Sequence, residues 1–237
     1  MNVWRFLESG PATGAENMAI DEELLRDARK ADTLPVLRFY SWSPYAVSLG
    51  RFQDAERSVN ADVCRRHGID IVRRITGGRA VLHRDELTYS VIARSDSELF
   101  PNDVLGTYKV IAAGLLAGLH ELGIPAEMVS RSSRHAGMVK SGTQEPACFS
   151  SPSWYEILVH GRKIVGSAQR RVGGVFLQHG SILIGYDAAL EAEVIPGGGM
   201  QDAVTCIRNE LGRGVSIEEM SKAFREGFSR ALDVQFL

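Results

Sequence analysis

The chain has 237 residues, of which 44% are hydrophobic and 24% are charged. This composition is that of an ordinary globular protein and excludes a disordered or fibrous chain. The length favours one domain over residues 1–237, with a core that needs no disulfide. Lysine and arginine number 27 against 29 aspartate and glutamate, and the formal charge of -2 gives no support for nucleic acid or anionic membrane as partners.

Features of the sequence indicate a cytoplasmic protein. Residues 1–10 lack the charged-then-apolar layout of a signal peptide, and no run approaches the ~20 apolar residues of a membrane span. Three cysteines are an odd number, which favours reduced thiols over a disulfide framework. Cys64 and Cys206 lie in predicted helices, where a small buried thiol is the expected role.

The first half of the chain is predicted to mix helices with short strands. Helical periodicity marks residues 14–30, 54–67 and 104–122. Short apolar and β-branched runs predict strands at residues 36–40, 45–49, 69–75 and 87–93. Gly68 and Gly123 stand where two of these helices end, since glycine tolerates the left-handed backbone of a helix terminus.

The second half begins with a polar, irregular stretch at residues 130–153, which predicts a long loop of a functional or mobile kind. Strands follow at residues 154–159, 163–168 and 175–184, the first two joined by a hairpin turn at 160–162. The last helix opens at Ser216, with Glu219 three residues later as in a capping box. Regular β-α alternation is too sparse for a doubly wound sheet, so we expect a mixed α/β domain of the α+β type.

Several common chemistries have no support in the sequence. It contains no phosphate-binding G-x-x-x-x-G-K-[ST], no G-x-G-x-x-G after a strand, no H-E-x-x-H, no C-x-x-C and no G-x-S-x-G. We therefore expect neither a metal site nor a nucleotide-binding loop of these kinds.

Three stretches carry candidate chemistry. In residues 73–83, a glycine pair after a strand lets the backbone approach a ligand beside several arginines, although a plain hairpin turn also explains it. Cys148 lies in a polar, proline-bounded loop, where a cysteine is either a nucleophile or incidental. Strand alternation places Lys163, Val165 and Ser167 on one face, so Lys163 either points into a site or is solvated. His83 and His179, taken singly, are more often structural than catalytic.

In their order along the chain, residues 74–83, 163–168 and 177–181 resemble the motifs of the biotin/lipoate protein ligase superfamily. Residues 4–6, 16–22, 147–149 and 152–156 add a resemblance to the single-domain octanoyltransferases of lipoate biosynthesis, so the likeness covers nearly the whole chain. The fold that this resemblance implies is a mixed, largely antiparallel sheet flanked by helices.

The resemblance also implies roles for individual residues. Cys148 would carry the acyl group as a thioester, with Lys163 beside it as the cation that favours the thiolate. The matching motif positions imply a substrate-binding set of Arg74, Gly77, Gly78, Arg79, His83, Gly166, Ser167, His179 and Gly180. We further expect Val81, Leu82 and Val165 to line an acyl tunnel, and Arg73, Arg74 and Arg79 to form a basic surface patch.

The expected donor is an octanoyl thioester on the phosphopantetheine arm of acyl carrier protein, and the expected acceptor is a lysine of a lipoyl-domain protein such as the glycine cleavage H protein. No cofactor, metal or ATP is expected, because one thioester exchanges for another. Lipoate ligases usually have a third glycine where Arg79 stands, and commonly an additional C-terminal domain that this sequence lacks. Arg84 stands where the family tends to have an aspartate after the histidine, so the resemblance implies no role for an acid at that position.

Other functions remain open at this point. They are an ATP-dependent lipoate ligase in which Cys148 is incidental, an amidotransferase between lipoyl domains, and a noncatalytic lipoyl-domain binding protein. A monomer is the expected oligomeric state.

Overall fold

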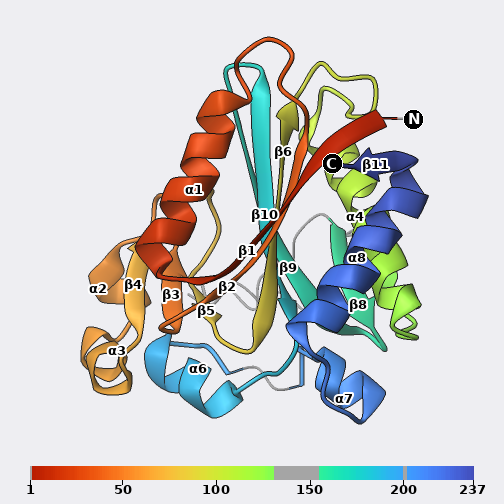
Figure 1. The fold of residues 1–237 in the computed structure, drawn as a ribbon. Coiled ribbons are helices and arrows are strands. Elements are labelled where there is room, and N and C mark those ends of the chain that lie inside the picture. The colour runs from red at the N-terminus through yellow and green to blue at the C-terminus, as the bar shows by residue number, and fades with distance from the viewer. Residues whose placement is uncertain (1, 131–154, 200–201) are drawn as a thin grey trace.

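The computed structural model describes residues 2–130, 155–199 and 202–237 (Figure 1). Its largest feature is an eight-stranded sheet in which most neighbouring strands are antiparallel, while β1 runs parallel to both of its neighbours. In spatial order the strands are β11 (Val234–Phe236), β1 (Asn2–Ala12), β2 (Val36–Trp42), β6 (Glu86–Arg94), β10 (Val175–Leu183), β9 (Arg162–Val172), β8 (Tyr155–Val159) and β7 (Glu127–Ser130).

One face of this sheet is covered by α4 (Val104–Glu121) and α8 (Ile217–Leu232), which lie side by side on the right in Figure 1. The two helices approach closely because glycines face phenylalanines. A Cβ at Gly114 would lie 2.5 Å from the ring of Phe228, and one at Gly118 would lie 2.4 Å from the ring of Phe224. The main core therefore lies between this helix pair and the sheet.

The opposite face carries α1 (Gly14–Asp27). Thr13 and Glu16 form a reciprocal capping box at its start, which satisfies backbone N–H groups of the first turn. A second sheet of β4 (Asp70–Arg73), β3 (Ala46–Leu49) and β5 (Val81–His83) packs beside α1. The remaining helices are α2 (Ala55–Ser58), α3 (Ala61–His67), α6 (Ala188–Val194) and α7 (Ile207–Leu211).

The predicted fold class is confirmed, and so are several boundaries. The turn after β8 has two central residues with positive φ, His160 at 49° and Gly161 at 77°, as a tight hairpin requires. Ser216 caps α8 by accepting a hydrogen bond from the backbone N–H of Glu219. Gly68 ends α3 with φ 62°, in the left-handed region.

Other boundaries differ from the prediction. The single helix expected over residues 54–67 is two short helices, because Asn60 caps α3 with its side chain and so starts a new helix. Strands β1, β5, β7 and β11 and helix α6 were not predicted. Cys206 is buried, as expected, but it is the residue before α7 rather than a residue within a helix.

A β-bulge in β9 corrects the predicted direction of Lys163. Ile157 of β8 pairs with Val165, whereas the next residue, Leu158, pairs with Lys163, so Ile164 is an extra residue in β9. Successive residues of β8 face opposite sides of the sheet, and therefore Lys163 faces away from Val165 and Ser167. The expectation that these three share one face is wrong, and Lys163 shares the α1 side with Gly166.

Within the described part of the chain, no helix combines the length and the apolar character needed to span a bilayer.

Candidate active site

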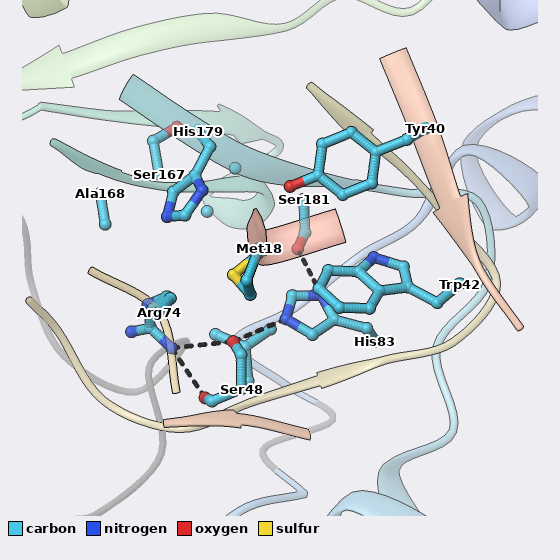
Figure 2. A pocket seen from close by; sticks show the side chains of 13 residues that line it. Met18, Tyr40, Trp42, Ser48, Arg74, His83, Ser167, Ala168, His179 and Ser181 are labelled. Carbon is cyan, nitrogen blue, oxygen red and sulfur yellow. Dashed lines mark hydrogen bonds between the residues drawn. The ribbon is translucent and has the colours of Figure 1, made fainter. Parts of the chain in front are cut away.

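A cavity lies between α1 and the two sheets (Figure 2). Met18 of α1 lies in the middle of the view, between the side chains that β2 and β10 contribute. Every element that surrounds the cavity supplies one to three of its lining residues, which are Met18, Tyr40, Trp42, Ser48, Arg74, Val81, His83, Gly166, Ser167, Ala168, His179, Gly180 and Ser181. The site therefore forms where segments far apart in the sequence meet in the fold.

Glycine is required where β9 and β10 meet at the cavity. Gly180 pairs with Ser167, and a Cβ at Gly180 would lie 2.2 Å from the backbone oxygen of Gly166. Because that oxygen belongs to the neighbouring strand, it cannot move aside without breaking the sheet. The two strands therefore approach one another closely at this part of the cavity wall.

His83 is fixed on three sides. Its Nε2 lies 2.7 Å from Oγ of Ser48, and its Nδ1 lies 2.8 Å from Oε1 of Glu86. The ring of Trp42 stacks on the imidazole at 4.0 Å between centroids. Glu86 is buried and also accepts hydrogen bonds from Thr88 and Ser181, at 2.5 and 3.0 Å.

His179 is held in a second buried network. Its Nε2 lies 2.7 Å from Oγ1 of Thr76, and its Nδ1 lies 3.1 Å from Oδ2 of Asp21. Asp21 also forms a fully buried ion pair with Arg38, at 2.8 Å. Burial lowers the pKa of His179 below its usual value, and the hydrogen bond and charge of Asp21 oppose that shift only in part.

The carboxylate of Asp21 stays ionised although it is buried. Burial alone would raise its pKa, but the hydrogen bond and charge of His179, together with Arg38, outweigh burial and hold the pKa below its usual value. The hydroxyl of Tyr40 also donates to Asp21, at 3.1 Å, and burial followed by the nearby Asp21 charge raises the pKa of Tyr40 well above its ordinary value.

The side chains of Arg73 and Arg74 donate hydrogen bonds to backbone carbonyl groups. Arg74 is buried and donates to the backbone oxygens of Ser48, Gly77 and Arg79. Arg73 donates to the backbone oxygen of Gly50, at 2.9 Å, and to two further carbonyls of the same loop. The predicted basic surface patch is therefore wrong for Arg74, whose guanidinium faces inward because it anchors the glycine loop.

Lys163 forms a buried ion pair with Glu156, with 3.3 Å between Nζ and Oε1. The two side chains are only 6% and 4% exposed. Because the bulge turns Lys163 to the α1 side of the sheet, its ammonium group lies on the same face as Gly166, which lines the cavity. The alternative of a solvated lysine is wrong, since burial removes this side chain from water.

The cavity thus brings together six residues of the predicted substrate-binding set: Arg74, His83, Gly166, Ser167, His179 and Gly180. Three others, Gly77, Gly78 and Arg79, lie in the loop that Arg74 anchors and do not line the cavity. Among the expected tunnel residues Val81 lines it, whereas Leu82 and Val165 line other hollows. Cys148 lies outside the described residues.

Sequence reasoning missed several residues of the site. Ser48 and Trp42 lie in short strands that carry no distinctive motif. Asp21 and Glu86 are far in sequence from two of their hydrogen-bond partners, His179 and Ser181. One signal was available: Met18 and Asp21 are three residues apart on α1 and so share its inward face, where a buried acid is unusual.

Arg84 holds the turn between β5 and β6 against α6. Its guanidinium forms an ion pair with Asp187, which caps that helix, and lies 5.2 Å from the centroid of the Tyr45 ring. The following residue, Asp85, forms a 3.1 Å ion pair with Arg208. Among the described residues, no group of three or more His, Cys, Asp or Glu side chains is arranged to hold a metal ion.

Comparison with known proteins identifies the family. Residues 13–229 match the family described as the lipoyl protein ligase A/B catalytic domain. The octanoyltransferase LipM of Brevibacillus brevis is 42% identical over 246 residues, covering 99% of this chain and 89% of that protein. LipM of Bacillus subtilis is 38% identical over 243 residues, covering 98% and 87%.

Solved structures show the same fold. The structure titled as a putative lipoate protein ligase from T. acidophilum with bound lipoic acid has a TM-score of 0.77 and 27% identity, covering 99% of this chain and 88% of that one. A lipoate-protein ligase A bound with ATP has a TM-score of 0.80 and 26% identity, covering 99% and 87%. This chain therefore belongs to the lipoyl protein ligase A/B catalytic domain family, in which its similarity to LipM places it with the octanoyltransferases.

Proposed function

We propose that this chain moves an octanoyl group from acyl carrier protein to Cys148, as a thioester, and then to a lysine of a lipoyl-domain protein such as the glycine cleavage H protein. Relatives named octanoyltransferase, 38% and 42% identical over nearly the whole chain, support octanoyl transfer in lipoate biosynthesis. The observation that carries the chemistry is a buried ammonium group, Lys163, on the sheet face that lines an apolar cavity.

We propose that the acyl tail binds at this cavity. Its wall includes the apolar surfaces of Met18, Tyr40, Trp42 and Val81. Burial of an acyl tail against such a wall stabilises the bound state by about 0.8 kcal/mol for each CH₂ group.

A buried ammonium favours a nearby thiolate. An ordinary thiol has a pKa of about 8.5, so only a few per cent is ionised at neutral pH, and an adjacent cation raises that fraction. Lys163 lies on β9, and its buried ion pair with Glu156 supports the proposal of a cation shielded from water. We propose Lys163 as the cation that activates Cys148.

Transfer by this route needs no ATP. Exchange of a thioester on the carrier protein for a thioester on Cys148 retains the activated bond, and transfer to an amine then forms a more stable amide. The thioester carbonyl requires hydrogen-bond donors as charge develops on its oxygen, and removal of one such donor typically costs about 2.7–4 kcal/mol. Backbone N–H groups of Gly77, Gly78 or Cys148 are the proposed donors.

One experiment tests the covalent intermediate. Incubation of the chain with octanoyl acyl carrier protein, without ATP, should increase its intact mass by one octanoyl group, and Cys148→Ser should show no increase. The matched control is Cys64→Ser, which removes a buried thiol of α3 and should load as the unaltered chain does. A Cys148→Ser variant that loads normally would contradict the proposal.

A second experiment tests Lys163. In Lys163→Ala, alkylation of Cys148 by iodoacetamide should require a higher pH than in the unaltered chain, because the stabilising cation is lost. Lys222→Ala, which removes a lysine of α8, is the control. An identical alkylation profile in both variants would exclude Lys163 from this role.

An ATP-dependent lipoate ligase is the second candidate, favoured by the fold shared with a lipoate-protein ligase A bound with ATP. It predicts ATP-dependent attachment of free lipoate that survives Cys148→Ala. An amidotransferase between lipoyl domains predicts instead that octanoyl H protein outcompetes octanoyl acyl carrier protein as donor. Competition between these donors, with and without ATP, separates the three activities.

A further inference from the structure

The turn between β3 and α2 carries an unusually exposed aromatic side chain. Among the large apolar side chains of the described residues, Phe52 has the highest exposure, 87%. A single exposed apolar residue is ordinary on a protein surface, so exposure alone indicates no function. The backbone and the charges around Phe52 are two further observations, and together they indicate a surface built to meet a partner.

The backbone of this turn is held in one conformation. The guanidinium of Arg73 donates to the backbone oxygens of Gly50 and Gln53, at 2.9 and 2.8 Å. The backbone N–H of Gly50 donates to the side chain of Gln53 at 2.9 Å, and the backbone N–H of Arg51 donates to the backbone oxygen of Thr76 at 2.9 Å. An aromatic side chain on a fixed backbone loses little conformational freedom when a partner covers it, which is typical of anchor residues in protein interfaces.

The charge around Phe52 is positive. The guanidinium of Arg51 lies 5.4 Å from the centroid of the Phe52 ring. Arg73 is exposed as well, and neither arginine forms an ion pair with a carboxylate of the residues that the structure describes. Residues 51–79 contain seven arginines and four acidic residues, in a chain whose formal charge is -2. This part of the molecule therefore attracts anionic groups although the whole chain does not.

A second exposed apolar side chain lies next to these arginines. β4 is the edge strand of the small sheet, and Ile71 and Arg73 are two residues apart on it, so their side chains point to the same side. Ile71 is 41% exposed. Arg51, Phe52, Ile71 and Arg73 together are called the β4–α2 surface below. The two elements that give this surface its name lie at the left edge of the molecule in Figure 1.

The β4–α2 surface is joined to the cavity through Arg74. This arginine lines the cavity and donates to the backbone oxygen of Gly77, at 3.0 Å. The glycine loop in turn packs closely on the turn between β3 and α2, since a Cβ at Gly50 would lie 2.0 Å from the backbone oxygen of Gly78. A partner bound to the β4–α2 surface therefore contacts segments that Arg74 ties to the wall of the cavity.

We propose that the β4–α2 surface docks the acyl carrier protein that delivers the octanoyl thioester. This inference rests on the proposed function and names the surface that one of its two partners contacts. Acyl carrier proteins are acidic, and their acyl arm is attached through an anionic phosphodiester, which arginines bind well. The acceptor instead presents a lysine, which is cationic in water and which these arginines repel. Charge therefore favours the donor as the occupant of this surface.

The residues of the surface have different tasks in such a complex. The Phe52 ring is the anchor, because it is the largest apolar group that a partner can cover there. Arg51 and Arg73 contact carboxylates around the anchor, where charge acts mainly on the rate of association and on its salt dependence. Since Arg73 also holds the turn, Arg51 is the arginine whose replacement tests docking without disturbing the backbone.

Two donors separate docking from chemistry. Octanoyl acyl carrier protein presents the thioester together with the protein body, whereas octanoyl pantetheine presents the same thioester without it. In Phe52→Ala and in Arg51→Glu, kcat/KM for loading from the carrier protein should fall by about 10-fold or more, mainly through KM. For octanoyl pantetheine it should stay within about 2-fold of the unaltered chain, because neither side chain lines the cavity.

Binding gives the same comparison without turnover. Fluorescence anisotropy of labelled carrier protein should show a Kd about 10-fold higher for Phe52→Ala and for Arg51→Glu than for the unaltered chain. Salt raised from about 0.05 M to about 0.3 M should weaken binding to the unaltered chain more than binding to Arg51→Glu. Urea unfolding midpoints should be unchanged in both variants, because both side chains are exposed.

Matched control variants come from the two helices on the other face of the large sheet. Leu105→Ala removes a side chain of α4 that is 37% exposed, and Lys222→Glu reverses an exposed charge on α8. Both controls should bind the carrier protein and load from either donor as the unaltered chain does. A loss in the controls equal to that in the two test variants would overturn the assignment to the β4–α2 surface.

Three further results would overturn the docking surface while the unaltered chain still forms its octanoyl adduct. The first is unchanged binding and loading in both test variants. The second is an equal loss with both donors, which would mean that the site itself had changed. The third is normal loading followed by slow transfer from the octanoyl enzyme to a lipoyl domain, which would make the acceptor the occupant. Failure of the unaltered chain to load from carrier protein would instead contradict the proposed function, and the docking surface with it.

Discussion

His83 and His179 are two buried histidines of the cavity, and they differ in the charged groups that lie around them. His179 faces a carboxylate already neutralised by Arg38, and burial lowers its pKa. A histidine of this kind is a structural hydrogen-bonding group at neutral pH. Protonation of His179 is therefore more favourable in the unfolded chain than in the folded chain. The free energy of unfolding should for this reason depend on pH.

The free energy of unfolding should therefore fall as the pH drops below about 6.5, the pKa of an unfolded histidine. Because the folded pKa of His179 is lower, the unfolded chain binds the proton first, and the stabilising contribution is complete only above that pH. Urea unfolding at about pH 7.5 and about pH 5.5 should show a smaller fall in His179→Gln than in the unaltered chain. Equal falls would contradict this account of His179.

The ion pair of Arg38 with Asp21 gives a second prediction for single residues. Arg38→Leu leaves a buried carboxylate without its guanidinium and should reduce the free energy of unfolding by about 3–5 kcal/mol. The control is Arg65→Leu, which breaks an exposed pair with Asp62 and should cost less than about 1 kcal/mol. Similar losses in the two variants, measured by urea unfolding, would show that Arg38 contributes no more than a surface pair.

The charge of a side chain can be predicted from the sequence, but the groups that the side chain contacts cannot. The sequence indicates that Arg73 and Arg74 are cationic, and only the fold decides that Arg74 turns inward to hold the glycine loop. Glu86 stayed unnoticed because one of its partners, Ser181, lies 95 positions away in the chain. Local pattern carries no information on such a contact.

Among the elements, β9 shows how one residue changes a site. Alternation over residues 163–168 predicts that Lys163 shares a face with Val165, and the extra residue Ile164 reverses that arrangement. A bulge of this kind has no local sequence signal, since Ile164 is an ordinary strand residue. The correct face of Lys163 emerges only from the pairing of β9 with β8.

The packing of α4 on α8 also depends on single positions. A Cβ at Gly227 would lie 2.3 Å from the backbone nitrogen of Gly118, which cannot move without displacing α4. Gly227→Ala should therefore lower the free energy of unfolding by about 1–3 kcal/mol, despite the better helix propensity of alanine. In Gly214→Ala no atom lies within 4 Å of the added Cβ, so the free energy of unfolding should not change. Thermal unfolding of both variants measures the difference. A neutral Gly227→Ala would contradict the close approach.

At the scale of the whole molecule, the predicted mixed and largely antiparallel sheet is correct, while its edges were missed. The strand at one edge, β11, pairs with β1, so that the two ends of the sequence meet in one sheet. Three residues such as Val234–Phe236 are too few for a recognisable period. Central strands were found because they are longer and more apolar.

The architecture also explains why the site could be assembled from scattered motifs. Residues of α1, β2, β3, β5, β9 and β10 meet at one cavity because the small sheet packs beside α1 against the large one. The order of motifs along the chain identified the family, whereas their distances from one another required the fold. The candidate site therefore depends on contacts between the two sheets.

We propose that this chain transfers octanoyl through a thioester without ATP. The most direct measurement is the mass of a purified lipoyl domain after incubation with the chain and octanoyl acyl carrier protein, in buffer freed of nucleotide. We expect the domain's lysine to gain one octanoyl group, and we expect no gain with Cys148→Ser. A gain that appears only when ATP and free acid are supplied, and that survives Cys148→Ser, would contradict it.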